Sequence, residues 1–285
     1  MMISFDGLNV WWFLNESLKL HKGHVLEALC VQLGRGCPID IGGVDVIKWI
    51  EDAVDRKVRK LEFKLSWLSE LISLPDRLYV CNTLVFLTIS DKVFLDVPCL
   101  VCSPSLEILC LFSVVYKDEN AIVRLLSGCH VLKHLGVERQ RSDNLKNIIV
   151  KVPCLKTLIL HSYSPALIVD KALIQVLSHL DDEFTRSLSS TSAKQDEDLS
   201  ICFNPPAFVP ECLSNSLEIF EWENYKGRKG EKDLVRFLLA NSMCLKRVGI
   251  SIEPTWWSTG KVRKELKSMS KVSIYQFDIH LSVSL

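Results

Sequence analysis

One short pattern recurs along the chain and constrains its fold more than any other feature. It consists of an apolar residue, two variable residues, a second apolar residue, one variable residue and a third apolar residue. Its copies occupy 58–63, 84–89, 106–111, 132–137, 155–160, 217–222 and 245–250. The first positions of successive copies are 26, 22, 26, 23, 62 and 28 residues apart. Intervals of roughly 20–29 residues are typical of leucine-rich repeats.

The last two apolar residues of each copy are two positions apart, so in a β-strand both side chains point to one face. A single strand cannot bury this face alone, whereas stacked copies form a parallel sheet with a continuous core. Helical patterns at 45–54, 119–127 and 232–241 precede three of the copies. The predicted fold class is α/β, a leucine-rich-repeat solenoid with parallel strands and outer helices.

The interval of 62 residues between the fifth and sixth copies interrupts this series. It contains a helical stripe at 171–180 and a polar stretch without periodicity at 185–198, for which we expect a helix and a mobile loop. An insertion explains the interval, and so does an altered exon that replaces one or two repeats. The pattern leaves both explanations open.

Composition excludes several classes of protein. Apolar residues make up 48% of the 285 residues, enough to fill a core, so the chain is not wholly disordered. The 34 Lys and Arg residues balance 34 Asp and Glu residues, so no global positive field attracts nucleic acid or anionic lipid. The longest uncharged run, 78–90, is too short for a membrane helix. An odd number of cysteines, 11, and the lack of a secretory signal indicate a cytoplasmic or nuclear location.

No residue pattern points to catalysis, a cofactor or a metal. Cys99-x-x-Cys102 has the spacing of half a zinc site, but no second pair follows it, and we expect both thiols to be packed in a crossover. His130 and His134 do not share a face in a strand. We therefore predict a protein that is not an enzyme and has no catalytic, cofactor-binding or metal-binding residues. A hydrolase or transferase site hidden within 162–205 is the alternative.

Partner binding is expected on the strand face that points away from the core. The outward positions follow each first apolar residue by two, four and six residues. Four of them are large and apolar: Phe86, Ile108, Phe112 and Ile159. Because a run of exposed apolar side chains marks an interaction site, we predict that they bind a partner protein. The alternatives are a loop, such as 185–205, that covers them, and a register shifted by one residue.

Two adjacent tryptophans lie in loop sequence beyond the last copy. Trp256 and Trp257 stand between Pro254 and Gly260. Such a pair either anchors a partner or closes the end of a repeat array. We favour closure and keep both residues as partner-binding candidates.

The C-terminal part of the sequence resembles a domain of a known plant family. The residues that carry the resemblance are at 210–213, 216–218, 220–222, 225–227, 239–242, 244–246 and 264–271. They are similar to the FBD domain of plant F-box/LRR proteins. Upstream, 13–22 and 49–54 resemble the segment that follows the F-box in that family. The resemblance implies a leucine-rich-repeat region at 1–165, an irregular insertion or degenerate repeat with a mobile loop at 166–205, and an FBD domain at 206–285.

Members of that family normally begin with an F-box, a helical module that docks on a Skp-type adaptor of a cullin ubiquitin ligase. This chain begins after the place of that module, and 74–78, which superficially resembles an F-box opening, lies between two repeat copies. The resemblance therefore implies a non-catalytic module that recognises an unknown target protein, without its own F-box and without direct adaptor binding. A leucine-rich scaffold unconnected to ubiquitination is the alternative. We expect neither a membrane nor a nucleic acid as partner.

Overall fold

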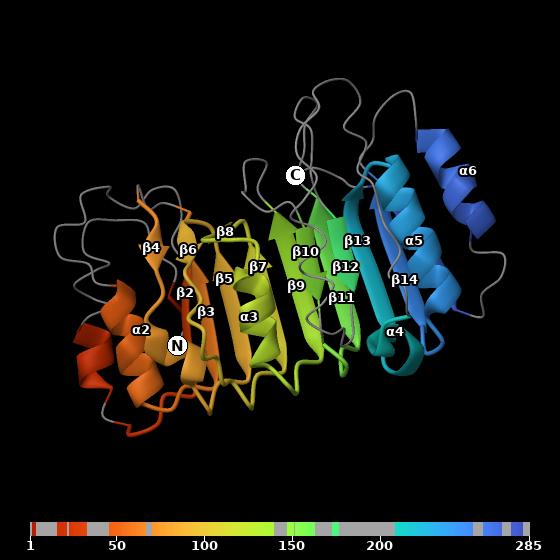
Figure 1. Ribbon diagram of the computed structural model, residues 1–285. Helices are drawn as coiled ribbons and strands as arrows, with labels where there is room; N and C mark the ends of the chain where they lie inside the picture. Colours follow the sequence, from red (N-terminus) through yellow and green to blue (C-terminus); the bar gives the residue numbers. More distant parts are fainter. Residues whose placement is uncertain are drawn as a thin grey trace, which may run out of the picture. The chain divides into compact units, whose positions relative to one another are not determined.

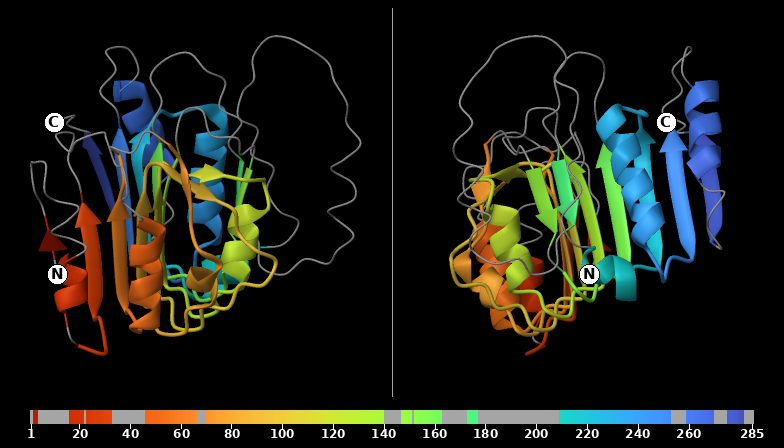
Figure 2. Two further views of the ribbon diagram at one scale, coloured as in Figure 1. Left: turned by 90° about the vertical axis from the view of Figure 1, so that its left-hand side faces the viewer. Right: turned by 45° about the vertical axis from the view of Figure 1, so that its right-hand side comes forward.

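The computed structural model describes residues 2–3, 16–21, 23–32, 46–66, 70–139, 147–150, 152–162, 173–176, 209–252, 259–269 and 275–281. The chain divides into two compact units, Met1–Asn144 and Leu145–Leu285. Each unit contains a sheet of parallel strands with helices along one of its faces (Figures 1 and 2). None of the described helices is long and apolar enough to cross a membrane.

The main sheet of the first unit has the strand order β1, β2, β3, β5, β7 and β9. Their bounds are, in that order, Met2–Ile3, Ala28–Gln32, Lys60–Lys64, Phe86–Ser90, Ile108–Phe112 and His134–Arg139. Neighbouring strands are parallel and in register, so that Lys60, Phe86, Ile108 and His134 are aligned across the sheet. The predicted stacking of the first four copies is confirmed within this unit.

The alternation of side chains explains why these strands stack. In β3, Leu61 and Phe63 point into the core and are 1% and 2% exposed, whereas Lys60, Glu62 and Lys64 point outward. Full burial of a Leu or Phe side chain contributes roughly 1.5–3 kcal/mol. Since β5, β7 and β9 repeat this arrangement, with their inward apolar residues buried, these copies share one continuous apolar core.

The crossovers between these strands form a second layer. Their helices are α2 (Val46–Asp55), the 3-10 helix η1 (Asp76–Val80) and α3 (Ala121–Ser127). Their strands are β4 (Ile72–Ser73), β6 (Val93–Leu95) and β8 (Val115–Tyr116), which form a second parallel sheet. The helices predicted at 45–54 and 119–127 agree with α2 and α3 to within two residues. The second sheet was not predicted, because strands of two or three residues carry no periodic signal.

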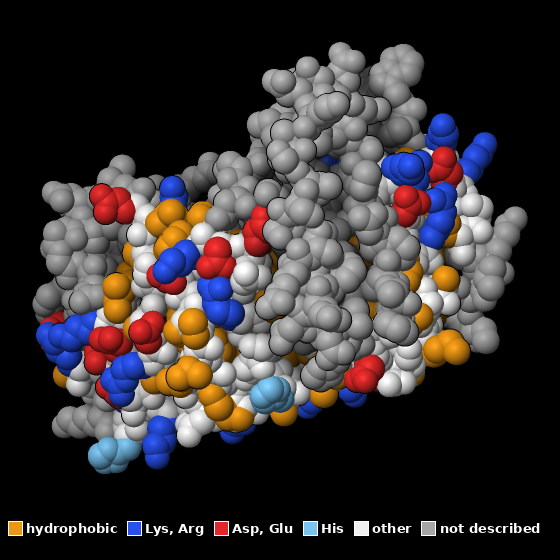
Figure 3. Space-filling model, in the orientation of Figure 1, with side chains coloured by type: hydrophobic (Ala, Val, Ile, Leu, Met, Phe, Trp, Pro, Cys, Tyr) orange, Lys and Arg blue, Asp and Glu red, His pale blue; other side chains and the backbone are white. Residues whose placement is uncertain are grey.

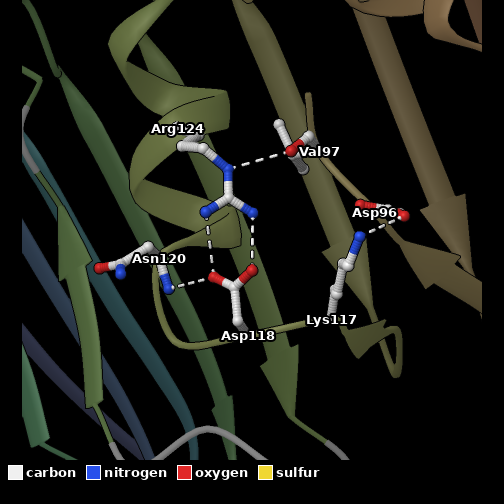
Figure 4. Close-up of polar contacts among 6 residues, drawn as sticks. All are labelled: Asp96, Val97, Lys117, Asp118, Asn120 and Arg124. Carbon is white, nitrogen blue, oxygen red and sulfur yellow. Dashed lines mark hydrogen bonds and ion pairs between the residues drawn. The ribbon is translucent and has the colours of Figure 1, made fainter. Parts of the chain in front are cut away.

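A cluster of polar contacts holds the crossover before α3 (Figure 4). The Arg124 guanidinium donates to both carboxylate oxygens of Asp118, at 3.1 and 2.8 Å, and to the carbonyl oxygen of Val97 at 3.0 Å. Asp118 Oδ1 also accepts the backbone N–H of Asn120 at 2.8 Å. These contacts tie the segment after β6 to the start of α3. Hydrogen bonding to Arg124 lowers the pKa of Asp118.

We expect Asp118→Asn to lower the free energy of unfolding by at most about 1 kcal/mol, because the pair with Arg124 is partly exposed and screened by solvent. The lowered pKa means that the carboxylate stabilises the fold above its ordinary pKa of 3.8, and that this contribution is lost as the pH falls through the lowered value. Denaturant unfolding from neutral pH down to about pH 2 measures the effect. A difference between wild type and variant that stays constant at acid pH would contradict the prediction.

The main sheet of the second unit has the strand order β11, β13, β14 and β15. Their bounds are, in that order, Thr157–Ser162, Ile219–Tyr225, Arg247–Ile252 and Gln276–Leu281. These strands are also parallel, and the predicted strands at 155–160, 217–222 and 245–250 are confirmed. The helices of this unit are α4 (Glu211–Asn215), α5 (Lys229–Asn241) and α6 (Thr259–Met269). A separate parallel pair consists of β10 (Asn147–Val150) and β12 (Leu173–Val176).

The helix predicted at 171–180 is wrong where the structure describes it, because Leu173–Val176 form strand β12. Pairing with β10 supplies backbone hydrogen bonds to an extended chain, and this tertiary contact outweighs the local helical spacing. β11 and β13 are direct neighbours, so the interval of 62 residues is an excursion between adjacent strands. The loop predicted at 185–198 lies outside the described residues.

Candidate interaction surface

The crossover layer of the first unit presents a surface of mixed charge (Figure 3). Acidic and basic side chains are interspersed over it rather than gathered by sign. Arg77 pairs with Asp55, and Lys117 pairs with Asp96. Exposed pairs of this kind contribute about 0–1 kcal/mol each. Because a mixed surface steers no charged partner, the charge of this face does not mark it as a recognition site.

The opposite, outward face is formed by the strand side chains that point away from the core. Since the strands are in register, these side chains make three rows across β3, β5, β7 and β9. The rows are Lys60, Phe86, Ile108 and His134; Glu62, Thr88, Cys110 and Gly136; and Lys64, Ser90, Phe112 and Glu138. These are the positions that the sequence pattern predicts to point outward.

Four of these side chains, Phe86, Ile108, Cys110 and Phe112, form what we call the apolar patch. All four are half-buried. Phe86 and Ile108 are aligned on neighbouring strands. A Cβ added at Gly136 would lie 3.2 Å from Cys110 Sγ and 3.7 Å from Phe112 Cε1, so the glycine leaves room for both side chains beside β9. The apolar patch is therefore continuous across β5 and β7 and reaches β9.

Charged residues border the apolar patch on two sides. Lys60 Nζ lies 4.8 Å from the centre of the Phe86 ring and 3.2 Å from a carboxylate oxygen of Glu62. On the other side, Glu138 accepts a hydrogen bond from Ser113 Oγ at 3.1 Å. An apolar centre with a polar rim is the usual layout of a protein–protein interface.

The surroundings of Cys110 do not favour nucleophilic chemistry at its thiol. Burial raises the pKa of Cys110, and a hydrogen bond with Thr88 opposes this only in part. A thiol with a raised pKa is a poor nucleophile. Cys99 and Cys102, which we expected to be packed, are exposed. In the part of the chain that the structure describes, no group of three or more His, Cys, Asp or Glu side chains is placed to hold a metal ion.

The remaining predicted site residues lie elsewhere. Ile159 points outward from β11 of the second unit and is half-buried. Trp256 and Trp257 lie outside the described residues, and so does the covering loop considered at 185–205. The structure thus brings Phe86, Ile108 and Phe112 together within one unit.

The second unit contains a feature that we did not predict, a cleft of about 310 Å³ on the outward face of β13, β14 and β15. Its lining residues are Glu221, Trp222, Glu223, Arg247, Gly249, Ser251, Asp278 and His280. A signal for it is present in the sequence, because Gly249 occupies an outward position of the copy at 245–250. Glycine inside a strand often marks a place where another group approaches the backbone closely.

Parallel strands of recurring spacing, with a shared apolar core and crossovers on one side, define a leucine-rich-repeat protein. A model of the LRR repeats of the FBD-associated F-box protein At5g56370 matches residues 46–205. The FBD model matches residues 204–250. The chain belongs to the plant F-box/FBD/LRR-repeat family.

Curated relatives come from Arabidopsis thaliana. The chain is 34% identical over 369 residues to the putative F-box/FBD/LRR-repeat protein At1g22000, with 93% of this chain and 78% of that protein covered. It is also 34% identical over 369 residues to the putative F-box/FBD/LRR-repeat protein At3g49480, with 92% and 82% covered. Over 162 residues it is 40% identical to the putative F-box/FBD/LRR-repeat protein At4g00315, with 56% and 37% covered. No solved structure matches the chain.

The relatives contain residues that have no counterpart in this chain. An alignment of 369 positions exceeds the 285 residues of this chain by 84, so at least 84 positions are occupied by the relative alone. That length equals about three repeats of the spacing found here.

Proposed function

We propose that the chain is a non-catalytic module that recognises a target protein, as the target-binding part of an F-box-type ubiquitin-ligase subunit. The observation that carries the proposal is the apolar patch, in which Phe86 and Ile108 are aligned on neighbouring strands and Cys110 lies between Ile108 and Phe112 along β7. Half-buried apolar side chains with a charged rim favour a protein partner. Family membership supports the same role, because the relatives are named for F-box, FBD and LRR parts.

The cysteines and the family matches support further parts of the proposal, namely the compartment, the mode of binding and the domain boundaries. No disulfide joins the cysteines that the structure describes, which supports a reducing compartment, the cytoplasm or the nucleus. The raised pKa of Cys110 supports capture without covalent chemistry. We keep the domain boundaries 1–165, 166–205 and 206–285, supported by the FBD match that begins at residue 204.

Replacing Phe86 and Phe112 by Ser tests the apolar patch. We expect the double variant to recover at least about tenfold less target from plant extract, because each aromatic anchor contributes roughly 1–2 kcal/mol or more to an interface. Affinity purification with quantitative mass spectrometry measures the recovery. Leu100→Ser is the matched control, because Leu100 is 82% exposed in a crossover and lies outside the patch. Unchanged recovery by a folded double variant would remove the apolar patch from the proposal.

The link to ubiquitination needs a separate measurement. We expect a Skp-type adaptor or a cullin to be recovered with the target when the gene's longest coding form is used as bait. Target recovery with neither component, from the short and the extended form alike, would instead identify a scaffold unconnected to ubiquitination. The Phe86→Ser and Phe112→Ser changes distinguish target binding from adaptor binding, because they abolish recovery of the target and leave recovery of any adaptor unchanged.

A further inference from the structure

The cleft on the outward face of β13, β14 and β15 has a glycine floor between two acidic positions. Gly249 is aligned with Glu221 on one neighbouring strand and with Asp278 on the other. A Cβ added at Gly249 would find only Glu221 Cγ within 4 Å, at 3.5 Å. The space above the glycine is therefore open, and its volume of about 310 Å³ is that of a small ligand site.

Carboxylates outnumber permanent cations in this cleft. Its lining contains Glu221, Glu223 and Asp278 but only one guanidinium, that of Arg247. Arg247 Nη2 donates to Glu221 Oε1 at 2.6 Å, which compensates one of the three negative charges. Three carboxylates against one guanidinium leave a net negative charge in this lining, so the cleft attracts a positively charged group.

Neighbouring side chains hold the other two carboxylates in place. His161 Nδ1 lies 2.9 Å from Glu223 Oε2, and Gln276 Nε2 donates to Asp278 Oδ2 at 2.9 Å. A carboxylate has about four lone-pair positions, so these contacts orient each group and leave acceptor capacity for a bound cation. Orientation before binding lowers the entropic cost of association.

The separation of the carboxylates selects an organic cation over a metal ion. Glu221 and Asp278 stand on strands two apart, and with neighbouring strands about 4.8 Å apart their Cα atoms are separated by about 10 Å. A divalent ion requires ligand oxygens within about 2.0–2.6 Å of itself, and the described residues contain no group placed to hold one. A guanidinium presents five N–H donors in one plane, and its methylene stem packs against a floor without a side chain. We propose that the cleft receives an arginine side chain of a partner protein.

The test is an NMR titration of the full isotope-labelled chain with the peptide acetyl-GSRSG-amide. We expect the amide signals of Gly249 and Ser251 to shift at millimolar peptide concentration, and the shifts to shrink as salt is added. The comparison peptide carries citrulline, which has nearly the shape of arginine without its charge. Its shifts are expected to be at least about fivefold smaller, because it lacks the charge-assisted hydrogen bonds.

Substitutions in the cleft test whether the shifts of the amide signals arise from binding there. Gly249→Leu fills the open space and is expected to abolish binding, and Glu221→Gln with Asp278→Asn abolishes it without changing the shape of the cleft. Glu62→Gln, a carboxylate of the outward face of the first unit, is the control and keeps binding unchanged. Because the apolar patch lies in the other unit, Phe86→Ser leaves the titration unaffected, and the two binding sites succeed or fail separately. Equal shifts with citrulline, shifts that persist in the folded cleft variants, or no shift at all would overturn the proposal.

Discussion

Glu231→Ala is expected to lower the free energy of unfolding by about 3 kcal/mol. Glu231 is 5% exposed in the first turn of α5, and its Oε2 accepts the backbone N–H groups of Lys226 at 3.0 Å and Arg228 at 3.1 Å. These donors belong to the turn that leads into the helix, where backbone N–H groups have no intrahelical acceptor. Truncation leaves both without their partner, at a cost of roughly 1–3 kcal/mol for each donor kept from water. Denaturant unfolding at neutral pH measures the loss.

Glu231→Gln separates the hydrogen bonds from the charge. The amide keeps one acceptor oxygen, so we expect it to cost less than half as much as Glu231→Ala. Burial raises the pKa of Glu231 above its ordinary value of 4.5. The native state therefore binds the proton more tightly than the unfolded state, and the free energy of unfolding falls as the pH rises from about 4.5 through the raised pKa. This decline should be absent in Glu231→Gln, and a pH profile identical to that of wild type would disprove the assignment.

Gly128→Ala is expected to cost about 3 kcal/mol of unfolding free energy. A Cβ at Gly128 would lie 2.5 Å from both the carbonyl oxygen and Cγ1 of Val101. The two segments cannot separate easily, because the Ser103 N–H donates to the Gly128 carbonyl oxygen at 2.9 Å. Gly128 ends α3 with a φ of −88°, so close approach of the backbone, and not a left-handed conformation, requires glycine here.

Gly249→Ala is the matched control for this prediction. Its added Cβ meets Glu221 Cγ at an ordinary contact distance of 3.5 Å, so we expect its midpoint of thermal unfolding to stay close to that of wild type. A midpoint for Gly128→Ala as close to wild type as that of Gly249→Ala would mean that a backbone shift relieves the clash with Val101. The comparison requires only purified protein and a melting curve.

The main strands could be predicted because their signal is local. Each copy found in the sequence corresponds to a strand. The same apolar spacing occurs at 26–31 and 274–279, where the structure has β2 and β15, and these two copies were not predicted. The short strands β4, β6, β8 and β12 could not be predicted in this way. Strands of two to four residues are stabilised by their neighbours, and those neighbours are distant in the sequence.

Of the two candidate sites, the residues of the apolar patch were predicted from the sequence and the cleft was not. Phe86, Ile108 and Phe112 were predicted as outward residues, because alternation within a strand determines which face a side chain takes. The cleft was missed, because it depends on Glu221, Gly249 and Asp278 being aligned on three strands. Each of the three follows the first apolar residue of its copy by four positions, but Asp278 belongs to the copy at 274–279, which was not among the seven predicted.

The sequence by itself determined that this protein is built of repeated parallel strands, each with one side toward the core and one side pointing outward. That information lies in the spacing of a few neighbouring residues. Only the tertiary structure decided which outward side chains line the cleft on β13, β14 and β15. These side chains belong to segments whose separation along the chain carries no record of their distance in space. Folding brings them together through the register between strands, which is a property of pairs of strands and not of any one of them.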